Sequence, residues 1–331
     1  MSILGNTSLD VNKILPMKRP WAWEMYKKGV ANNWTPEEIA MQDDVEQWKS
    51  KTALTEEERA LALLNFGFFS VGESLTASNL VLVLYKYIKD PACRSYLLRQ
   101  AWEEQLHVHM FVYICDSLGL DPDHVYNMYK TVGEIKEKDD FVVELTQSLV
   151  DENIDVDTPE GKLSLLRNLI GYYIVMEGIF FYGGFAQMLA MKNKNKLVGA
   201  GQQFEYVLRD ESLHVQFGVN VINSIKEEAP EIWTDQLKNE LIDIVKKAVE
   251  LEHMYLEKTC PTAVVGIPQK LFKQYIEYIA DRRLESIGLP AQYKSENPFP
   301  WLSKVMDLSK ETNFFEKRVT EYAVGTLEDW D

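Results

Sequence analysis

Two copies of a Glu-x-x-His pattern are the residues in this sequence best suited to metal chemistry. Glu104 and His107 form the first copy, within EEQLHVHMF, and Glu211 and His214 form the second, within DESLH. A spacing of three residues places a carboxylate and an imidazole on the same face of a helix. One such pair alone is weak evidence, because Glu and His are common on solvated helix faces. The two pairs therefore have to be weighed together with their surroundings.

A lone acid lies in an apolar segment upstream of each pair. Glu73 precedes the first pair and Glu177 precedes the second, and each separation fits the rest of one helix, a turn and part of the next. Either acid alone could be an ordinary buried acid. Antiparallel packing of each helix pair would bring the lone acid level with its Glu-x-x-His pair. Two such pairs predict a four-helix core in which four carboxylates and two imidazoles point inward.

Metal cations would compensate the charge of such a buried cluster, because an unpaired buried ion is strongly destabilising. Carboxylate oxygen and imidazole nitrogen together suit iron and manganese better than metals that prefer thiolates. Four Glu and two His, arranged in this order, match the ligand set of ferritin-like di-iron and di-manganese proteins. The sequence therefore predicts a dinuclear site in an all-α, ferritin-like helical bundle with additional helices.

Composition and charge limit the other possibilities. The chain has 331 residues, of which 46% are hydrophobic and 26% charged, as is typical of a soluble globular protein. Its formal net charge of -16 repels phosphate backbones, so we expect no nucleic-acid partner. Cys93, Cys115 and Cys260 are far apart and form no C-x-x-C motif, which favours a reducing, cytoplasmic location without disulfides.

Two apolar segments, 60–85 and 168–191, are long enough to cross a bilayer. Each contains polar residues and a single acid near its middle, which is more typical of a buried core helix. We therefore expect no membrane association, and the N-terminus shows no secretory signal pattern.

The chain divides into three expected parts: an irregular N-terminal arm over 1–54, a ferritin-like helical domain over 55–302, and a C-terminal helix and flexible tail over 303–331. Thr55 with Glu58, and Thr158, are typical helix starts, and Pro91 suits a first helical turn. The segments expected to be helical are 55–89, 91–118, 122–150, 159–193, 199–227, 234–259 and 268–287.

Longer motifs around the six candidate ligands resemble a known family over nearly the whole chain. They include ANNWTPEEIAMQDDVEQWKS, LNFGFFSVGESL, YLLRQAWEEQLHVHMFVYICDSLGL, GYYIVMEGIFFYGGF, YVLRDESLHVQFG, YIADRRLESIGL and NPFPW. These motifs resemble the small, radical-generating subunit of class I ribonucleotide reductase, and most closely its chlamydial-type subgroup, class Ic. The resemblance implies a thioredoxin-linked oxidoreductase that acts on ribonucleoside diphosphates and forms a homodimer.

The resemblance also implies a role for each candidate ligand. Glu73, Glu104 and His107 would hold metal site 1, and Glu104 would be a bridge. Metal site 2 would be held by Glu177, Glu211 and His214, with Glu211 as the other bridge. The cofactor that reacts with O2 would be a manganese/iron pair, with two manganese or two iron ions as alternatives.

Radical transfer is implied by a further set of matching residues. Trp34 and Asp210 would begin the route from the metals, joined to them through His107. Tyr322 would pass the oxidising equivalent to the large catalytic subunit, to which the C-terminal tail would dock. Tyr206 matches a residue that helps to reduce the cofactor during activation.

Phe111 is the main departure from the commoner family pattern. Most members have a tyrosine four residues after the first ligand histidine, and that tyrosine stores the radical. Phe111 has no phenolic hydrogen to lose, and Tyr113 lies roughly 200° away around the helix. Glu73 also stands where many members have Asp. Both features resemble class Ic, in which the manganese/iron pair itself holds the oxidising equivalent.

Apolar residues near the ligands would keep water away from this oxidant. Phe181 and Phe185 follow Glu177 by one and two helical turns, and Val207 precedes Glu211 by one turn. Ordinary core packing explains the same residues equally well.

Two alternative functions share the six ligands. One is an R2-like oxidase that acts on a bound lipid-like ligand, and the other is a non-catalytic ferritin-like metal-binding protein. Neither alternative needs a Trp34–Asp210–Tyr322 route or an extended tail, so Tyr322 and the tail favour the reductase subunit.

Overall fold

The computed structural model describes residues 2–5, 12–79, 83–151 and 154–303. Residues 1–298 form one compact unit, and the fold described below is that of this unit. Tyr322 and the rest of the expected tail lie outside the described residues. The described residues are overwhelmingly helical, which confirms the all-α prediction.

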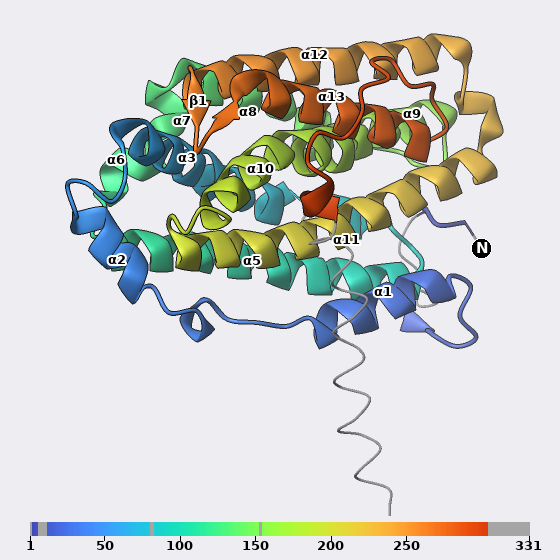
Figure 1. Cartoon of the computed structure of the whole chain (residues 1–331). Coiled ribbons are helices and arrows are strands. Elements are labelled where there is room, and N and C mark those ends of the chain that lie inside the picture. The colour runs from blue at the N-terminus through green and yellow to red at the C-terminus, as the bar shows by residue number, and fades with distance from the viewer. Residues whose placement is uncertain (1, 6–11, 80–82, 152–153, 304–331) are drawn as a thin grey trace, which may run out of the picture. The chain divides into compact units, whose positions relative to one another are not determined.

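The metal-site candidates lie on four long helical stretches (Figure 1). They are α3 (Glu56–Asn79), α5 (Pro91–Leu118), the continuous run of α9, a π-helical segment and α10, and α11 (Val198–Glu228). The run comprises α9 (Pro159–Leu169), the π-helical segment (Ile170–Phe180) and α10 (Phe181–Lys192). α3 packs against α5, and the run packs against α11, as the repeated sequence pattern predicts.

A second layer covers the run on its other side. It consists of α8 (Gly133–Asp151), α12 (Asp235–Thr259) and α13 (Gln269–Ser286). As a result, every residue from Ile170 to Met191 is buried.

Among the described residues, two helices are apolar and long enough to cross a membrane by length and composition alone. The apolar stretch within Pro159–Lys192 is fully buried, and 61% of the stretch within Glu56–Ala77 is buried. Both are core helices of the bundle, as expected from their central acids.

Local capping explains where several helices begin. The Thr55 backbone N–H donates to Glu58 Oε2 (2.9 Å), and the Glu58 N–H donates to Thr55 Oγ1 (3.2 Å), which is a reciprocal capping box. The Gly161 N–H donates to Thr158 Oγ1 (3.1 Å), and Pro91 is the first residue of α5. These three expected helix starts are confirmed.

The N-terminal segment is more regular than expected. It contains α1 (Pro20–Ala31), a 3-10 turn (Pro36–Glu38) and α2 (Gln42–Lys49). α1 packs on α5 and α11, so contacts with the bundle order a segment whose own sequence pattern is weak. The expectation of an irregular arm over 1–54 is wrong in this respect.

Several other elements also differ from the expectation. The segment 122–150 is divided into α6 (Pro122–Tyr126), α7 (Met128–Thr131) and α8, and a short α4 (Tyr85–Tyr87) follows α3. A two-stranded hairpin, β1 (Ala263–Val264) and β2 (Ile267–Pro268), precedes α13. Its turn residues Val265 and Gly266 both have positive φ, which suits a tight hairpin turn.

The capping box gives a direct stability prediction. Thr55→Ala removes the side-chain oxygen that accepts the Glu58 N–H, so the free energy of unfolding should fall by about 1 kcal/mol. Urea unfolding of the metal-free protein, followed by circular dichroism, measures this change. Thr52→Ala, at an exposed position just outside the cap, is the control and should leave the midpoint unchanged. Equal midpoints for both variants would show that the box does not stabilise the protein.

Candidate metal centre

The six expected ligands come together in the middle of the bundle. Their side chains are fully buried and form two overlapping groups, in each of which the possible ligand atoms lie within 4.8 Å of one another. Glu104 and Glu211 belong to both groups. The first group adds Glu73 and His107, and the second adds Glu177 and His214. The arrangement matches two adjacent metal positions that share two carboxylates.

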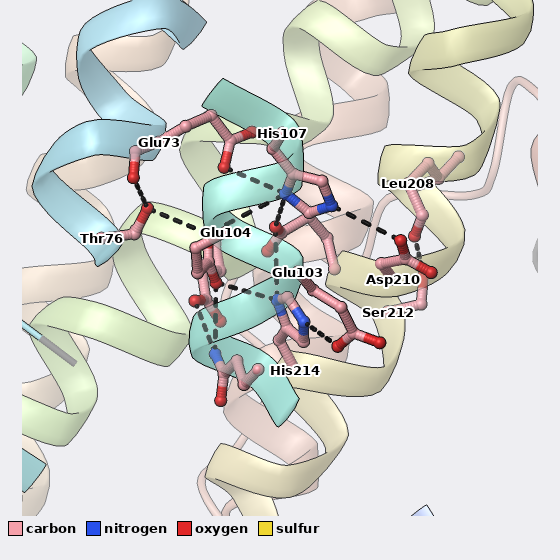
Figure 2. A network of polar contacts seen from close by, with 12 residues as sticks. Glu73, Thr76, Glu103, Glu104, His107, Leu208, Asp210, Ser212 and His214 are labelled. Atoms are coloured by element: carbon pink, nitrogen blue, oxygen red, sulfur yellow. Dashed lines mark hydrogen bonds and ion pairs between the residues drawn. The ribbon is translucent and has the colours of Figure 1, made fainter. Parts of the chain in front are cut away.

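Both imidazoles turn Nδ1 toward the carboxylates (Figure 2). His107 Nδ1 lies 3.2 Å from Glu73 Oε2 and 3.2 Å from Glu211 Oε1. His214 Nδ1 lies 3.1 Å from Glu104 Oε1 and 3.3 Å from Glu211 Oε1. Glu211 Oε1 therefore lies between the two rings, where a bridging ligand would have to be.

The other nitrogen of each ring faces a carboxylate outside the cluster. His107 Nε2 lies 3.5 Å from Asp210 Oδ2, and His214 Nε2 lies 2.9 Å from Glu103 Oε2. Such partners fix the tautomer and orientation of a ligating histidine and raise its basicity. Glu103 is fully buried and also accepts a hydrogen bond from Arg99 Nε (2.9 Å). Glu103 was not singled out from the sequence, although it directly precedes Glu104.

Neutral hydrogen-bond donors complete the surroundings of the cluster. Thr76 Oγ1 lies 3.1 Å from Glu104 Oε2, and Gln100 Nε2 donates to Glu177 Oε1 (3.1 Å). Neither residue was identified from the sequence. Their spacing was an available signal, because Thr76 follows Glu73 by three residues and Gln100 precedes Glu104 by four.

Unsatisfied polar atoms show that this cluster fits cations. Glu73 Oε1, Glu177 Oε2, both Glu211 oxygens and His214 Nδ1 are buried and form no hydrogen bond of acceptable geometry with the described residues, in spite of the short distances between the imidazoles and the carboxylates. Leaving so many buried polar atoms unpaired is strongly unfavourable in a dry core. Two divalent cations among these atoms would satisfy them, and oxygen with imidazole nitrogen is the donor set that manganese and iron accept.

The electrostatics of the metal-free cluster favour bound protons. Burial raises the pKa of Glu73 well above its usual range, and burial with repulsion from Glu211 and Glu104 does the same for Glu177. Burial alone would lower the pKa of His107 and His214, but the neighbouring carboxylates raise both well above the usual value. Metal binding therefore has to displace protons from the cluster.

Phe111 is fully buried among other phenylalanines. Its ring centroid lies 5.9 Å from that of Phe69 and 5.6 Å from that of Phe204. Phe69 in turn contacts Phe181 (4.8 Å) and Phe185 (5.1 Å). Val207, the third expected apolar neighbour, is also fully buried. Phe69 and Phe204 belong to the same cluster but were not singled out from the sequence.

Trp34 links the cluster to a half-buried tyrosine. Its Nε1–H donates to Asp210 Oδ2 (2.8 Å), the same oxygen that faces His107. The Trp34 ring centroid lies 6.4 Å from that of His107 and 5.2 Å from that of Tyr206. Gln202 Nε2 donates to the Tyr206 hydroxyl (3.4 Å). An unbroken series of contacts therefore joins Tyr206 to the metal cluster.

Other titratable residues near the pattern lie elsewhere. The Tyr113 hydroxyl donates to the Ile39 carbonyl (3.2 Å), away from Phe111. His109 Nε2 lies 2.9 Å from Glu37 Oε1, and both side chains are half exposed. These positions agree with the helical angles expected from the sequence.

The fold and the cluster define a ferritin-like helical protein whose core can hold a dinuclear metal site. A family model described as ribonucleotide reductase, small chain, matches residues 11–298. The chain is 51% identical over 328 residues to the ribonucleoside-diphosphate reductase subunit beta of Chlamydia pneumoniae, covering 99% of this chain and 94% of that protein. It is 30% identical over 314 residues to the ribonucleoside-diphosphate reductase small chain of Nicotiana tabacum, covering 95% of this chain and 89% of that protein.

A solved structure agrees with these relatives. The ribonucleotide reductase R2 subunit from Clostridium botulinum matches with a TM-score of 0.84 at 25% identity, covering 92% of this chain and 94% of that chain. The chain therefore belongs to the ribonucleotide reductase small-chain family, as its motifs predicted, and its activity is that of a ribonucleoside-diphosphate reductase small subunit.

The contact between His214 and Glu103 gives a prediction for metal affinity. Glu103→Gln keeps the size of the side chain but removes its charge, so His214 should become a poorer ligand and Mn(II) binding should weaken roughly 10- to 100-fold. Calorimetric titration of the metal-free protein measures this change. Asp116→Asn, at an exposed position on the same helix, is the control. Wild-type affinity in Glu103→Gln would contradict the role given to this carboxylate.

Proposed function

We propose that this chain uses a dinuclear manganese/iron centre to react with O2 and supplies the oxidising equivalent that starts ribonucleotide reduction in a large catalytic subunit. The observation that carries the proposal is a fully buried cluster of four carboxylates and two imidazoles, beside a phenylalanine rather than a tyrosine. Bound metals would supply the reaction with O2 and store the oxidising equivalent; two manganese or two iron ions are the alternative pairs.

The ligand roles follow from the two overlapping groups. Glu73 and His107 would hold the metal at site 1, while Glu177 and His214 would hold the metal at site 2. Glu104 and Glu211 would bridge, and their membership of both groups supports this assignment. Asp210 and Glu103 would keep each imidazole oriented with Nδ1 toward its metal.

The phenylalanine cluster would keep the centre dry and free of competing electron donors. Phe111, Phe181 and Phe185 offer neither a proton nor a hydroxyl group to the metals, and Val207 continues the same apolar surface. Water exclusion strengthens the charge interactions between ligands and metals. Because Phe111 cannot form a phenoxyl radical, the stored equivalent would rest on the metals.

Electron transfer would use the contacts around Trp34. Asp210 accepts the Trp34 Nε1–H and faces His107 Nε2, so it would hold a proton between the indole and the ligand imidazole. Tyr206, in ring contact with Trp34, would deliver an electron while the centre is activated. The same Trp34–Asp210–His107 series would later carry the oxidising equivalent outward to Tyr322 on the tail.

This route separates the proposal from two alternatives. An R2-like ligand-binding oxidase and a ferritin-like metal-binding protein need the six ligands but not an indole hydrogen-bonded to Asp210. The 2.8 Å contact between Trp34 and Asp210 therefore supports the reductase role.

The expected partners are the large subunit, through the C-terminal tail, and a second copy of this chain. Exposed apolar side chains on α5 are suited to homodimer formation. They are Leu98, Trp102 and Val112, whose exposed fractions are 54%, 56% and 43%. Cys93, Cys115 and Cys260 are buried free thiols, which supports the proposed cytoplasmic location.

The position of Phe111 predicts the spectroscopic behaviour of the active protein. Protein loaded with manganese and iron and exposed to O2 should support ribonucleotide reduction without a tyrosyl radical signal in electron paramagnetic resonance. Hydroxyurea, which quenches such radicals, should inhibit it only weakly. A tyrosyl radical whose amount tracks activity would contradict the proposal.

The tail gives a second prediction. Tyr322→Phe removes the phenolic hydrogen needed to relay the oxidising equivalent, so turnover with the large subunit should be lost while O2 consumption by the small subunit is unchanged. Tyr278→Phe, on α13 and not part of the proposed route, is the matched control. Wild-type turnover in Tyr322→Phe would contradict the relay.

A further inference from the structure

The helix that carries Glu177 has an unusual hydrogen-bond pattern. Ile170–Phe180 is a π-helix of 11 residues, and all of them are buried. π-helical turns are rare, which indicates that they are less favourable than α-helical turns, and they are frequent at functional sites. The neighbours of this segment should therefore include groups that stabilise it.

The hydrogen-bond pattern changes from π-helical to α-helical at the C-terminal end of the segment. The Phe181 N–H still bonds to the Met176 carbonyl, five residues back, whereas α10 continues with bonds to the fourth residue back. A change from the longer to the shorter ladder leaves one more carbonyl than there are amide partners. By this register the skipped carbonyl is that of Glu177, and the carbonyls that follow it lie where the two ladders meet.

Two cationic side chains from the covering layer donate to this junction. Arg283 Nε, on α13, donates to the Gly178 carbonyl (3.0 Å). Lys138 Nζ, on α8, donates to the Phe180 carbonyl (3.4 Å). Both carbonyls follow directly after the step between the two ladders, so the two cations contact the backbone where the π-helical pattern ends.

Both cations are held in place by other contacts. Lys138 is fully buried, pairs with Glu252 Oε2 on α12 (2.6 Å) and lies 3.9 Å from the centroid of the Tyr255 ring. The Arg283 guanidinium lies 4.7 Å from the centroid of the Tyr182 ring. Because these contacts already orient the two side chains, their hydrogen bonds to the carbonyls cost little side-chain entropy.

Gly178 allows the arginine to approach. A Cβ atom at this position would lie 3.2 Å from Arg283 Nε and 2.7 Å from the Tyr173 carbonyl oxygen. The glycine therefore leaves room both for the π-helical turn and for the arginine that donates to it.

Hydrogen bonds with α5 and α3 also hold the segment in place. Gln100 accepts a hydrogen bond from the Tyr173 hydroxyl (3.0 Å) and donates to Glu177 Oε1 (3.1 Å). The Tyr172 hydroxyl donates to the Thr76 carbonyl (2.8 Å). The position of Glu177 is therefore set between these inner contacts and the two outer cations.

We propose that Arg283, with Lys138, is a positioning residue that maintains the π-helical ladder at Gly178–Phe180 and thereby holds Glu177 against Glu104, Glu211 and His214. If the ladder relaxed to the α-helical form, the rotation per residue would increase and the Glu177 carboxylate would turn away from the cluster. The functional meaning rests on the proposed metal centre, but the structural effect is present without metal.

Hydrogen exchange of the metal-free protein tests the proposal directly. Arg283→Met keeps the length and apolar stem of the side chain but removes its donors. Backbone amides of 170–182 should exchange at least tenfold faster than in the wild type, while those of α5 and α11 should be unchanged. Arg282→Met changes the exposed neighbouring arginine and should behave as the wild type. Arg283→Lys restores a cationic donor and should recover most of the protection.

Metal titration gives a second readout. If the wild type binds two Mn(II) ions, as the proposed function requires, one should bind roughly tenfold more weakly to Arg283→Met, as expected when a group that orients a ligand is lost. The other ion should bind as before, because Glu73 and His107 lie on α3 and α5. The Lys138→Met/Glu252→Met double variant, which removes both charges of the buried pair, should show the same local increase in exchange at 170–182.

The outcomes separate this proposal from the proposed function. Faster exchange confined to 170–182 supports the positioning role, even if the wild type were to bind no metal and the proposed function were to fail. Exchange in Arg283→Met that equals that of Arg282→Met overturns the proposal. Faster exchange spread evenly over α10, α11 and α12 also overturns it, because Arg283 would then be a general stabilising residue.

Discussion

The concentration of negative charge in an apolar core is the constraint on which this structure depends. Four carboxylates meet at the centre of the bundle with two imidazoles, and several of their atoms have no hydrogen-bond partner among the described residues. Without metal, protons have to neutralise the cluster, and the raised pKa values of Glu73 and Glu177 express that need. With metal, the same atoms become ligands. The surrounding helices are therefore arranged to hold a site that is unfavourable until cations are bound.

The two halves of the site are similar but not equivalent. Each imidazole faces a buried carboxylate, yet Asp210 is shared with the Trp34 indole, whereas Glu103 is paired with Arg99. The first arrangement connects the His107 side to an aromatic residue that can carry an electron. The second arrangement connects the His214 side to Arg99, a side chain that cannot carry an electron. In the proposed function, this difference would direct electron transfer along Trp34.

Much of the site could be predicted because its residues follow helical spacing. The Glu-x-x-His pairs and the lone acids identify one face of each core helix, and the capping box at Thr55 and Glu58 identifies a helix start. Glu103 was missed because it lies about 100° around the helix from Glu104, and only packing against α11 brings it to His214. The π-helical ladder was missed because it depends on donors from distant helices such as Arg283. The helices of the N-terminal segment form against α5 and α11, so their own residues give little signal.

Anomalous diffraction from crystals of the metal-loaded protein, recorded at the manganese and iron absorption edges, tests the central claim most directly. We predict two peaks per molecule, both within bonding distance of Glu104 and Glu211, with His107 Nδ1 on one metal and His214 Nδ1 on the other. Because manganese also scatters anomalously above the iron edge, one peak in data recorded between the two edges and two peaks above the iron edge would identify the manganese/iron pair. Two peaks in both data sets would identify two manganese ions, and peaks only above the iron edge would identify two iron ions. A single metal per molecule, or metals bound outside this cluster, would contradict the dinuclear centre.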